Sequence, residues 1–243
     1  MHHLIVDRLD PDLAQMAIEG EQARHAVRVR RMEPGERLIL LDGAGGMAVA
    51  VVEDSDKNGP KSSWRLLVRI AEHRRHPPPE PAVHVLSPAP KGDLLETMID
   101  QLSQVGAASW RPLDTQRSER EPRQGKIERL VRITHESAKQ CGRPWFMRID
   151  AGIPFDEALR LSNAVIASAD GEAAGDVLPR LSAGAPIGSI HVLVGPEGGF
   201  SDAERSMAAA AGLPAVSLGP HVLRIGTAAV VAASAFVRTG SHS

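Results

Sequence analysis

Two short glycine-containing loops near the C-terminus hold the residues whose types and spacing could do chemistry. The first reads Gly-Pro-Glu-Gly-Gly over residues 195–199 and follows the apolar run Val192–Val194. The second reads Leu-Gly-Pro-His-Val-Leu-Arg over residues 218–224 and follows a β-type run that starts at Ala215. Because glycine leaves the main chain bare, a ligand can approach backbone groups closely there. The alternative is that both loops only make tight strand-to-helix turns.

The residues of the first loop argue against two common kinds of nucleotide-binding loop. It lacks the Gly-Lys-Ser/Thr of a P-loop, and its glycine spacing is not that of a dinucleotide fingerprint. Glu197 is the acid inside this loop, and Arg224 ends the second loop. The guanidinium of Arg224 could stabilise negative charge that develops on a substrate. It could equally form a salt bridge to Glu197 that closes the pocket.

Flanking residues predict that both loops connect a strand to a helix. Val192–Val194 is β-branched and apolar, as a buried strand should be. Ser201 followed three residues later by Glu204 fits a capping box, which predicts that a helix begins there. Gly212 ends that helix before the next strand. Since ligands bind at the carboxyl ends of strands in open α/β sheets, the two loops predict one shared pocket.

The segments before and after these loops show the same alternation of strand and helix patterns. We expect strands at Val83–Leu86 and Ala164–Ala169, and helices from Asp93, as a cap, to Val105, over Ile127–Cys141 and over Thr227–Val237. The last helix is nearly all alanine and valine, so it should be buried on most sides. This pattern indicates an α/β domain with a parallel sheet flanked by helices.

The N-terminal third is expected to form a small β-rich module. Strand patterns cover Arg37–Leu41, Met47–Glu53 and Trp64–Ile70, and a short helix is expected over Gln22–Met32. Pro77–Pro81 reads as a stiff, extended linker. We therefore expect one domain over residues 1–76 and a second over residues 82–243.

Composition excludes several classes of protein. The 243 residues carry a net charge of −2 and a single cysteine, Cys141, which rules out an internal disulfide framework. No apolar run is long enough to span a membrane, and the N-terminus lacks a signal-peptide pattern. The histidines lack the spacing of a metal site. We expect a soluble, cytoplasmic protein with no membrane partner and no metal.

Several motifs together resemble one known family. The segments 193–201 and 218–224, with Lys91-Gly92 and the Gln-Cys-Gly-Arg ending at Arg143, are similar to the RsmE-type methyltransferases of the SPOUT (α/β-knot) superfamily. These enzymes transfer a methyl group from S-adenosylmethionine to uridine N3 in 16S ribosomal RNA. The resemblance implies an N-terminal PUA-like β-barrel that binds RNA, and a C-terminal SPOUT domain with a trefoil knot. It also implies a homodimer that acts on 16S rRNA or the small ribosomal subunit.

The resemblance also assigns roles to particular residues. Arg224 and Glu197 become the catalytic candidates. The residues expected to bind S-adenosyl-L-methionine are Leu193, Val194, Gly195, Pro196, Gly198, Gly199, Leu218, Gly219, Pro220, Leu223 and Glu172. The residues expected to bind RNA are Arg24, Arg28, Arg30, Arg31, Lys91 and Arg143. The structural alternative for the N-terminal arginines is a solvated helix face.

Two positions depart from the family pattern. Gln104 stands where the family usually has glutamate, and Gly226 stands where the second loop motif often has another glutamate. No mechanism that needs a carboxylate at Gly226 can operate here. The competing functions are therefore a catalytically weakened or inactive RNA-binding protein of this fold, or a methyltransferase that acts on another RNA site.

Overall fold

The computed structural model describes residues 1–56, 64–118, 122, 124–182 and 187–237. The chain forms two compact units. The first contains Met1–Pro78 together with Ala138–Phe146, and the second contains Pro79–Ser137 together with Met147–Ser243. The change of unit between residues 78 and 79 falls within the Pro-rich segment Pro77–Pro81. Residues 138–146 belong to the first unit, although the sequence pattern assigned them to the second domain.

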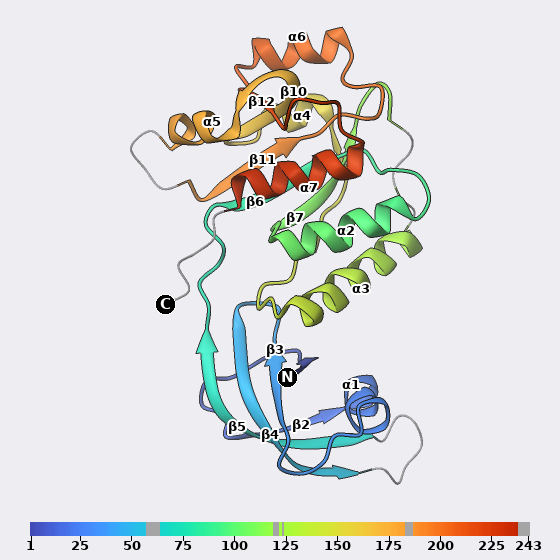
Figure 1. Cartoon of the computed structure of the whole chain (residues 1–243), viewed down its shortest axis with the longest axis vertical. Coiled ribbons are helices and arrows are strands. Elements are labelled where there is room, and N and C mark those ends of the chain that lie inside the picture. The colour runs from blue at the N-terminus through green and yellow to red at the C-terminus, as the bar shows by residue number, and fades with distance from the viewer. Residues whose placement is uncertain (57–63, 119–121, 123, 183–186, 238–243) are drawn as a thin grey trace. The chain divides into compact units, whose positions relative to one another are not determined.

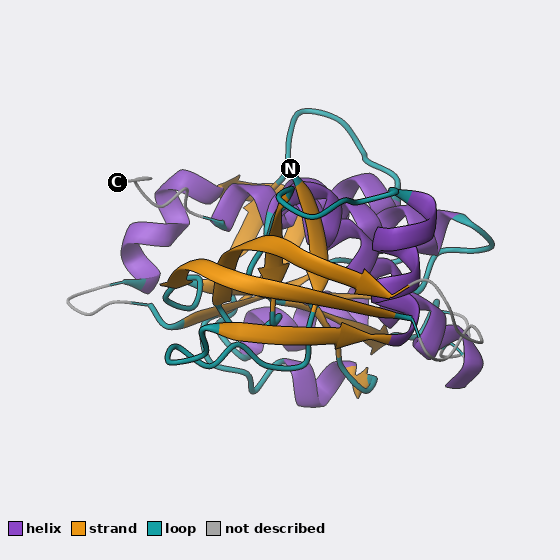
Figure 2. Cartoon of the chain, turned by 90° about the horizontal axis from the view of Figure 1, so that it is seen from below, coloured by secondary structure: helices purple, strands orange, loops and turns teal. Residues whose placement is uncertain are grey.

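The first unit is built on one curled sheet of five strands (Figure 1). Their order is β1-β3-β4-β5-β2; β1 runs parallel to β3, and every other pairing is antiparallel. The strands are β1 (His2–Ile5), β2 (Gln15–Glu19), β3 (Arg37–Leu41), β4 (Gly46–Asp56) and β5 (Arg65–Arg75). The pairing of β4 with β5 shifts register twice. Such irregularities bend a sheet, and the orange strands in Figure 2 twist and bend along their length.

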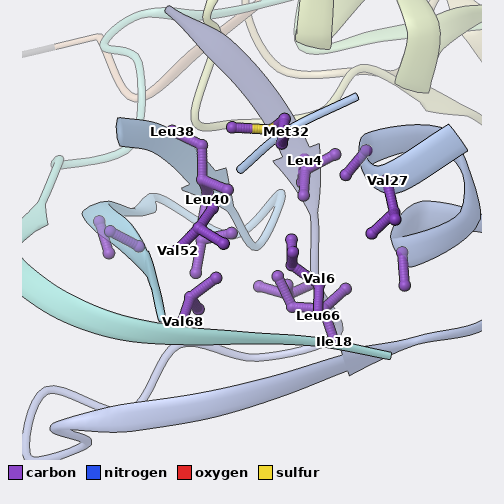
Figure 3. Packing of buried hydrophobic residues seen from close by; sticks show 14 of the residues in the cluster. Leu4, Val6, Ile18, Val27, Met32, Leu38, Leu40, Val52, Leu66 and Val68 are labelled. Carbon is purple, nitrogen blue, oxygen red and sulfur yellow. The ribbon is translucent and has the colours of Figure 1, made fainter. Parts of the chain in front are cut away.

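Alternating side chains on these strands form the core of the first unit. Leu38 and Leu40 on β3 and Leu66 and Val68 on β5 are fully buried, while Arg37 and Arg69 are exposed. This period of two is the pattern expected of strands with one face buried. Figure 3 shows these side chains meeting Leu4, Val6, Ile18, Val27, Met32 and Val52. Burying each one contributes on the order of 1.5–3 kcal/mol.

The helix expected over Gln22–Met32 is only partly present. Helix α1 covers Gly20–Arg24, and the chain then widens into a π-helical turn, η1, over His25–Val29. The Arg30 amide donates to the His25 carbonyl at 3.0 Å, five residues back. Arg31 has a left-handed backbone with φ of 53°, which ends the helix before Met32. The sequence pattern therefore placed the end of this helix wrongly.

Residues 138–146 pack on the hairpin between β3 and β4. The Gly45 amide donates to the Pro144 carbonyl at 2.9 Å, and the Phe146 amide donates to the Gly43 carbonyl at 3.0 Å. The Phe146 ring lies so close to Gly43 that a Cβ at that position would overlap it. Gly43 also has a positive φ of 70°, so only glycine suits this turn.

The second unit contains a parallel sheet, as the alternating pattern predicted. The strand order is β12-β10-β11-β6-β7-β8, with β9 paired to β7, and all these pairings are parallel. The strands are β6 (Ala82–Ser87), β7 (Ser109–Asp114), β8 (Arg148–Ile149), β9 (Ile153–Pro154), β10 (Ala164–Ala173), β11 (Ser189–Leu193) and β12 (Ala215–Ser217). The strands predicted from Val83, Ala164 and Val192 are confirmed within a few residues at their ends.

Helices cover this sheet. They are α2 (Leu94–Val105), α3 (Gln124–Cys141), α4 (Phe155–Ala158), α5 (Ala174–Leu181), α6 (Asp202–Ala210) and α7 (Ile225–Phe236). The left-handed Gly106, with φ of 98°, ends α2 as expected. Asp93 precedes α2, but its side chain makes no capping hydrogen bond because its own backbone is already helical. The capping role expected for Asp93 is therefore wrong.

The last helix, α7, is the most buried helix of the second unit. Ala228, Ala232 and Phe236 pack on the sheet side, whereas Ala229 and Ala233 pack in the same cluster as residues of α2. Helices α2 and α7 lie side by side (Figure 1) and run in the same direction. A Cβ on Gly226 would lie 3.8 Å from Met98, and one on Gly106 would lie 3.2 Å from Val237. The expected burial of this helix is confirmed, and alanine permits the close approach.

Candidate active site

A cavity of about 530 Å³ opens at the carboxyl ends of β10, β11 and β12. Its walls come from the end of β10, the loop after β11, helix α6, the loop after β12 and the start of α7. The lining residues are Ile166–Asp170, Val194–Phe200, Arg205, Ala208, Ala209, Leu213, Ala215, Leu218, Gly219, His221–Leu223, Ile225 and Ala228. The volume and the mostly apolar lining are those of a small-molecule site.

The first glycine loop forms one wall of this cavity. After Leu193 the chain makes a tight turn in which the Gly199 amide donates to the Pro196 carbonyl at 2.8 Å. Gly199 has a φ of 68°, a conformation that favours glycine. A Cβ on Gly195 would come within 3.1 Å of the Phe200 ring. The backbone therefore favours glycine at Gly199, and a side chain at Gly195 would be tightly packed against Phe200.

The capping box predicted at Ser201 is confirmed, and it fixes the end of this loop. The Glu204 amide donates to Ser201 Oγ at 3.2 Å, and the Ser201 amide donates to Glu204 Oε2 at 2.7 Å. Glu204 is only 3% exposed, and its second oxygen accepts a hydrogen bond from the Gln116 amide at 2.8 Å. Both carboxylate oxygens are thus satisfied by main-chain donors, as burial of a charged group requires.

The end of β10 supplies a second wall that the sequence did not predict. Ala167 and Glu172 of β10 both pair with Val216 of β12, so residues 168–171 bulge out of the ladder. Three of these residues, Ser168–Asp170, line the cavity. A Cβ on Gly171 would lie 2.5 Å from the Val216 backbone, so the bulge depends on this glycine.

Glu172, a predicted donor-binding residue, is engaged elsewhere. Its carboxylate accepts two hydrogen bonds from the Arg180 guanidinium, at 2.6 and 2.7 Å. This bidentate contact lowers the pKa of Glu172 below its usual value. Glu172 is not among the residues that line the cavity.

The second glycine loop closes the cavity, and Arg224 stands at its end. Leu218, Gly219 and Leu223 line the cavity, whereas Pro220 does not. Arg224 has an extended backbone, precedes the first residue of α7 as its N-cap, and is exposed. In the described part of the chain its side chain has no carboxylate partner. The alternative of a salt bridge to Glu197 is thus not realised here.

The structure brings together most of the predicted donor-binding residues. Val194, Gly195, Pro196, Gly198, Gly199, Leu218, Gly219 and Leu223 line one cavity, together with the catalytic candidate Glu197. Leu193 is completely buried and packs in a hydrophobic cluster with Leu86, Ile166 and Phe200. Its side chain is therefore part of the core beneath the loop.

The predicted RNA-binding residues differ in how exposed their side chains are. Arg28, Arg30, Arg31 and Lys91 are exposed. Arg24 binds the Glu21 carboxylate through Nε and Nη2, at 2.9 and 2.7 Å, which raises the pKa of the arginine. Arg143 is half-buried, and burial lowers the pKa of its guanidinium to about 10. Burial leaves Arg143 less accessible to a phosphate than the other residues.

Sequence reasoning missed five of the cavity residues, of which Asp170 and Arg205 lie outside the two loop motifs. Asp170, Phe200, Arg205, His221 and Val222 all line the cavity. The signal that could have found Asp170 is its place at the carboxyl end of a strand adjacent to β11, since parallel strands end at the same edge. No local pattern identifies Arg205, which reaches the site from the end of the first turn of α6.

The described residues hold no group of three or more His, Cys, Asp or Glu side chains that could bind a metal ion. In the same part of the chain, no helix is long and apolar enough to cross a lipid bilayer.

Comparisons with known proteins agree with this geometry. An RNA methyltransferase domain model matches residues 77–237, and an RNA methyltransferase PUA domain model matches residues 18–62. Ribosomal RNA small subunit methyltransferase E from Synechocystis is 31% identical over 226 residues, which cover 90% of this chain and 71% of that protein.

Solved structures of similar fold include two with a bound methyl donor. Ribosomal RNA small subunit methyltransferase E from Neisseria gonorrhoeae, bound to S-adenosyl methionine, superposes with a TM-score of 0.81 at 24% identity, covering 97% of this chain and 96% of that one. A methyltransferase from Legionella pneumophila with bound S-adenosyl methionine gives a TM-score of 0.75 at 27% identity, covering 96% and 95% of the two chains.

Proposed function

The chain belongs to the RNA methyltransferase family that includes ribosomal RNA small subunit methyltransferase E, and on this premise we propose that it methylates 16S ribosomal RNA with S-adenosylmethionine. The target atom that the resemblance to RsmE-type methyltransferases implies is uridine N3. The observation that carries the proposal is the cavity formed by the two Gly-Pro loops. It has the volume and the mixture of apolar walls and main-chain groups that suit an adenosine joined to an amino acid.

The residues present fit this donor. Gly195 and Gly199 keep the loop free of side chains, so main-chain groups can contact adenine and ribose closely. Leu218 and Leu223 supply apolar surface from the second loop. When bound, S-adenosylmethionine supplies a methyl group already activated by its sulfonium. The protein has mainly to orient the two reactants, and the two loops that line the cavity can serve that purpose.

Arg224 is the proposed catalytic residue. Methylation at uridine N3 requires loss of the N3 proton, which leaves negative charge shared with the uracil carbonyls. Arg224 does not line the cavity but stands between the lining residues Leu223 and Ile225, where an exposed guanidinium without a carboxylate partner in the described chain can stabilise that charge. Glu197 lines the cavity and is exposed, so it can orient the base or receive the proton.

The two departures from the family pattern lie in different places. Gln104 is exposed near the C-terminal end of α2, where its amide donates to Asp100 at 2.8 Å. Because α2 and α7 run in parallel, this position lies at the opposite end of the helix pair from Arg224. Gly226 lies in the first turn of α7, beside the cavity residue Ile225. Only Gly226 therefore bears on catalysis, and it favours a weakened enzyme as the second candidate.

Three further parts of the proposal concern substrate and assembly. The exposed Arg28, Arg30 and Arg31 of the first unit, with Lys91 of the second, are proposed to contact RNA phosphates. We also propose a cytoplasmic homodimer, and this part rests on the family alone, because the apolar side chains of α7 pack within the second unit. The trefoil knot remains a prediction that rests on the family.

The test is calorimetric titration of the protein with S-adenosylmethionine, followed by transfer of a labelled methyl group to small ribosomal subunits. We expect donor binding and one methyl group per subunit, recovered as 3-methyluridine after digestion. Light scattering on the same sample should give the mass of a dimer. Binding without transfer would support the weakened protein, and absence of both would overturn the proposed function.

A further inference from the structure

Arg117, which the proposed mechanism does not use, contacts the glycine loop from outside the cavity. It follows β7, and its Nη1 donates to the Gly198 carbonyl at 2.6 Å. A Cβ on Gly198 would lie 3.5 Å from Arg117 Cδ, so the side chain lies along this part of the loop. Gly198 lines the cavity, but Arg117 does not. The guanidinium therefore lies on the outer side of the wall.

The backbone that carries Arg117 is firmly held. The Gln116 amide donates to the buried carboxylate of Glu204 at 2.8 Å, and the Thr115 amide donates to Ser118 Oγ at 2.9 Å. Ser118 Oγ in turn lies 3.0 Å from the Thr115 carbonyl. These contacts fix the start of the arginine side chain relative to the glycine loop, so its position does not depend on a ligand.

No carboxylate among the described residues compensates the charge of Arg117. A guanidinium has five N–H donors and stays protonated. In the part of the chain that the structure describes, its one hydrogen bond is to the neutral carbonyl of Gly198, and no carboxylate pairs with it. By contrast, Arg180 pairs with Glu172 and Arg129 pairs with Glu96. An exposed, pre-positioned cation whose other N–H donors have no partner among the described residues suits an oxyanion.

We propose that Arg117 binds a phosphate of the substrate RNA next to the target nucleotide and, through Gly198, aligns the donor loop with it. This inference rests on the proposed function. The donor's carboxylate is the other possible anion, but the donor would lie inside the cavity while Arg117 is outside it. The same contact then gives Arg117 a second role, because RNA that binds Arg117 also steadies the loop that holds the donor.

The experiment compares Arg117→Met, which keeps an unbranched side chain about as long as the aliphatic part of arginine but removes the donors and the charge, with Arg117→Lys, which keeps the charge. The matched control is Arg160→Met. Arg160 is an exposed arginine of the same unit that follows α4 and precedes β10, at the amino ends of the strands and away from the cavity. RNA affinity is measured against salt concentration with small ribosomal subunits, and donor affinity by calorimetry.

Removing one phosphate contact should lower the slope of log affinity against log salt by about 0.7–0.9. We expect Arg117→Met to show this change, to raise the KM for subunits about tenfold, and to change donor affinity by less than about threefold. Arg117→Lys should restore the slope, and Arg160→Met should behave as wild type. If the wild type is active and Arg117→Met leaves both the slope and the KM unchanged, the proposed phosphate contact is wrong and the proposed function still stands. A large loss of donor affinity with an unchanged slope would instead assign Arg117 to the donor.

The slope also separates this inference from the proposed function. If the wild type fails to bind or use S-adenosylmethionine, the proposed function is wrong, but the RNA titrations still report on Arg117. Thermal melting of each variant completes the comparison. Because Arg117 is exposed, the melting temperatures of the Arg117 variants should stay within about 2 °C of that of the wild type.

Discussion

The imidazole rings of His84 and His191 stack face to face on the neighbouring strands β6 and β11, with centroids 4.8 Å apart. Nδ1 of His84 lies 2.8 Å from Ser109 Oγ, and Nδ1 of His191 lies 2.9 Å from the Ser162 carbonyl. Burial is the main cause that lowers the pKa of His84, to about 4, with smaller contributions from His191 and Arg148. The pKa of His191 is also lowered, mainly by burial.

This pair predicts a stability that falls in mild acid. Both pKa values are depressed in the folded state, so the unfolded chain binds more protons between pH 6.5 and about 4. The contribution of the two neutral histidines to the free energy of unfolding should therefore be fully present above pH 6.5 and should decrease as the pH falls through that window. Because both rings are partly exposed, we expect a loss of about 1–2 kcal/mol from His84. Urea unfolding from pH 7.5 to 4.5 measures it.

The control for the pH effect is His84→Phe, which keeps a stacked ring but cannot be protonated. Its unfolding free energy should depend less steeply on pH across the same window. An equally steep dependence in this variant would assign the acid sensitivity to other groups.

Gly195→Val should abolish donor binding. A Cβ at this position already comes within 3.1 Å of Phe200 and 3.2 Å of its amide, so the extra methyl groups must displace the loop or fill the cavity. Calorimetry with S-adenosylmethionine should show a loss of at least about 100-fold in affinity. The control is Gly175→Ala in α5, where nothing lies within 4 Å of the added Cβ. That variant should bind normally and gain up to about 1 kcal/mol in stability. Normal donor affinity in Gly195→Val would place the donor elsewhere.

Glu204→Ala should destabilise the second unit. It removes the acceptor for the buried Ser201 amide, which is then left without a partner, and for the part-buried Gln116 amide. We expect a loss of about 2–3 kcal/mol, the sum of a missing helix cap and an unsatisfied donor. The comparison is Asp202→Ala, whose side chain is 93% exposed and which should change stability by less than about 0.5 kcal/mol. Equal effects of the two substitutions on urea midpoints would contradict this account of the buried carboxylate.

Arg224→Ala should reduce turnover without weakening donor binding. Its side chain is exposed and makes no carboxylate contact in the described chain, so its removal should leave the fold intact. Loss of a charge-stabilising group at a reacting centre typically lowers kcat by about 100- to 1,000-fold. Single-turnover methylation of small subunits with saturating donor measures this step, and Arg224→Lys should recover part of it. Parallel losses of donor affinity and rate would show that Arg224 supports the cavity and not the reaction.

Local patterns predicted local structure well. Ser201 and Glu204 lie three residues apart, and their reciprocal hydrogen bonds follow from that spacing alone. The same holds for Gly106 at the end of α2. The two glycine loops were predicted to share a pocket because both follow parallel strands, and the structure confirms that their residues line one cavity.

Contacts between distant segments were not predictable from the same patterns. The bond between Gln116 and Glu204 joins residues 88 positions apart. The bulge of β10 depends on Gly171 approaching Val216, and nothing around Gly171 indicates that approach. In the first unit, the π-helical turn at His25–Val29 arises where Ala26 and Val27 must both reach the core, a requirement set by the sheet and not by the segment itself.

The first unit is discontinuous, since it is completed by residues 138–146. During synthesis on the ribosome, the hairpin between β3 and β4 must wait for Trp145 and Phe146 to emerge, nearly one hundred residues after β4 begins. Until then, Gly43 and Gly45 lack the aromatic rings that cover them. A gene fragment ending at residue 78 would therefore encode an N-terminal unit that lacks the segment packed on its β3–β4 hairpin. To reproduce the complete unit in isolation, the fragment must also include residues 138–146.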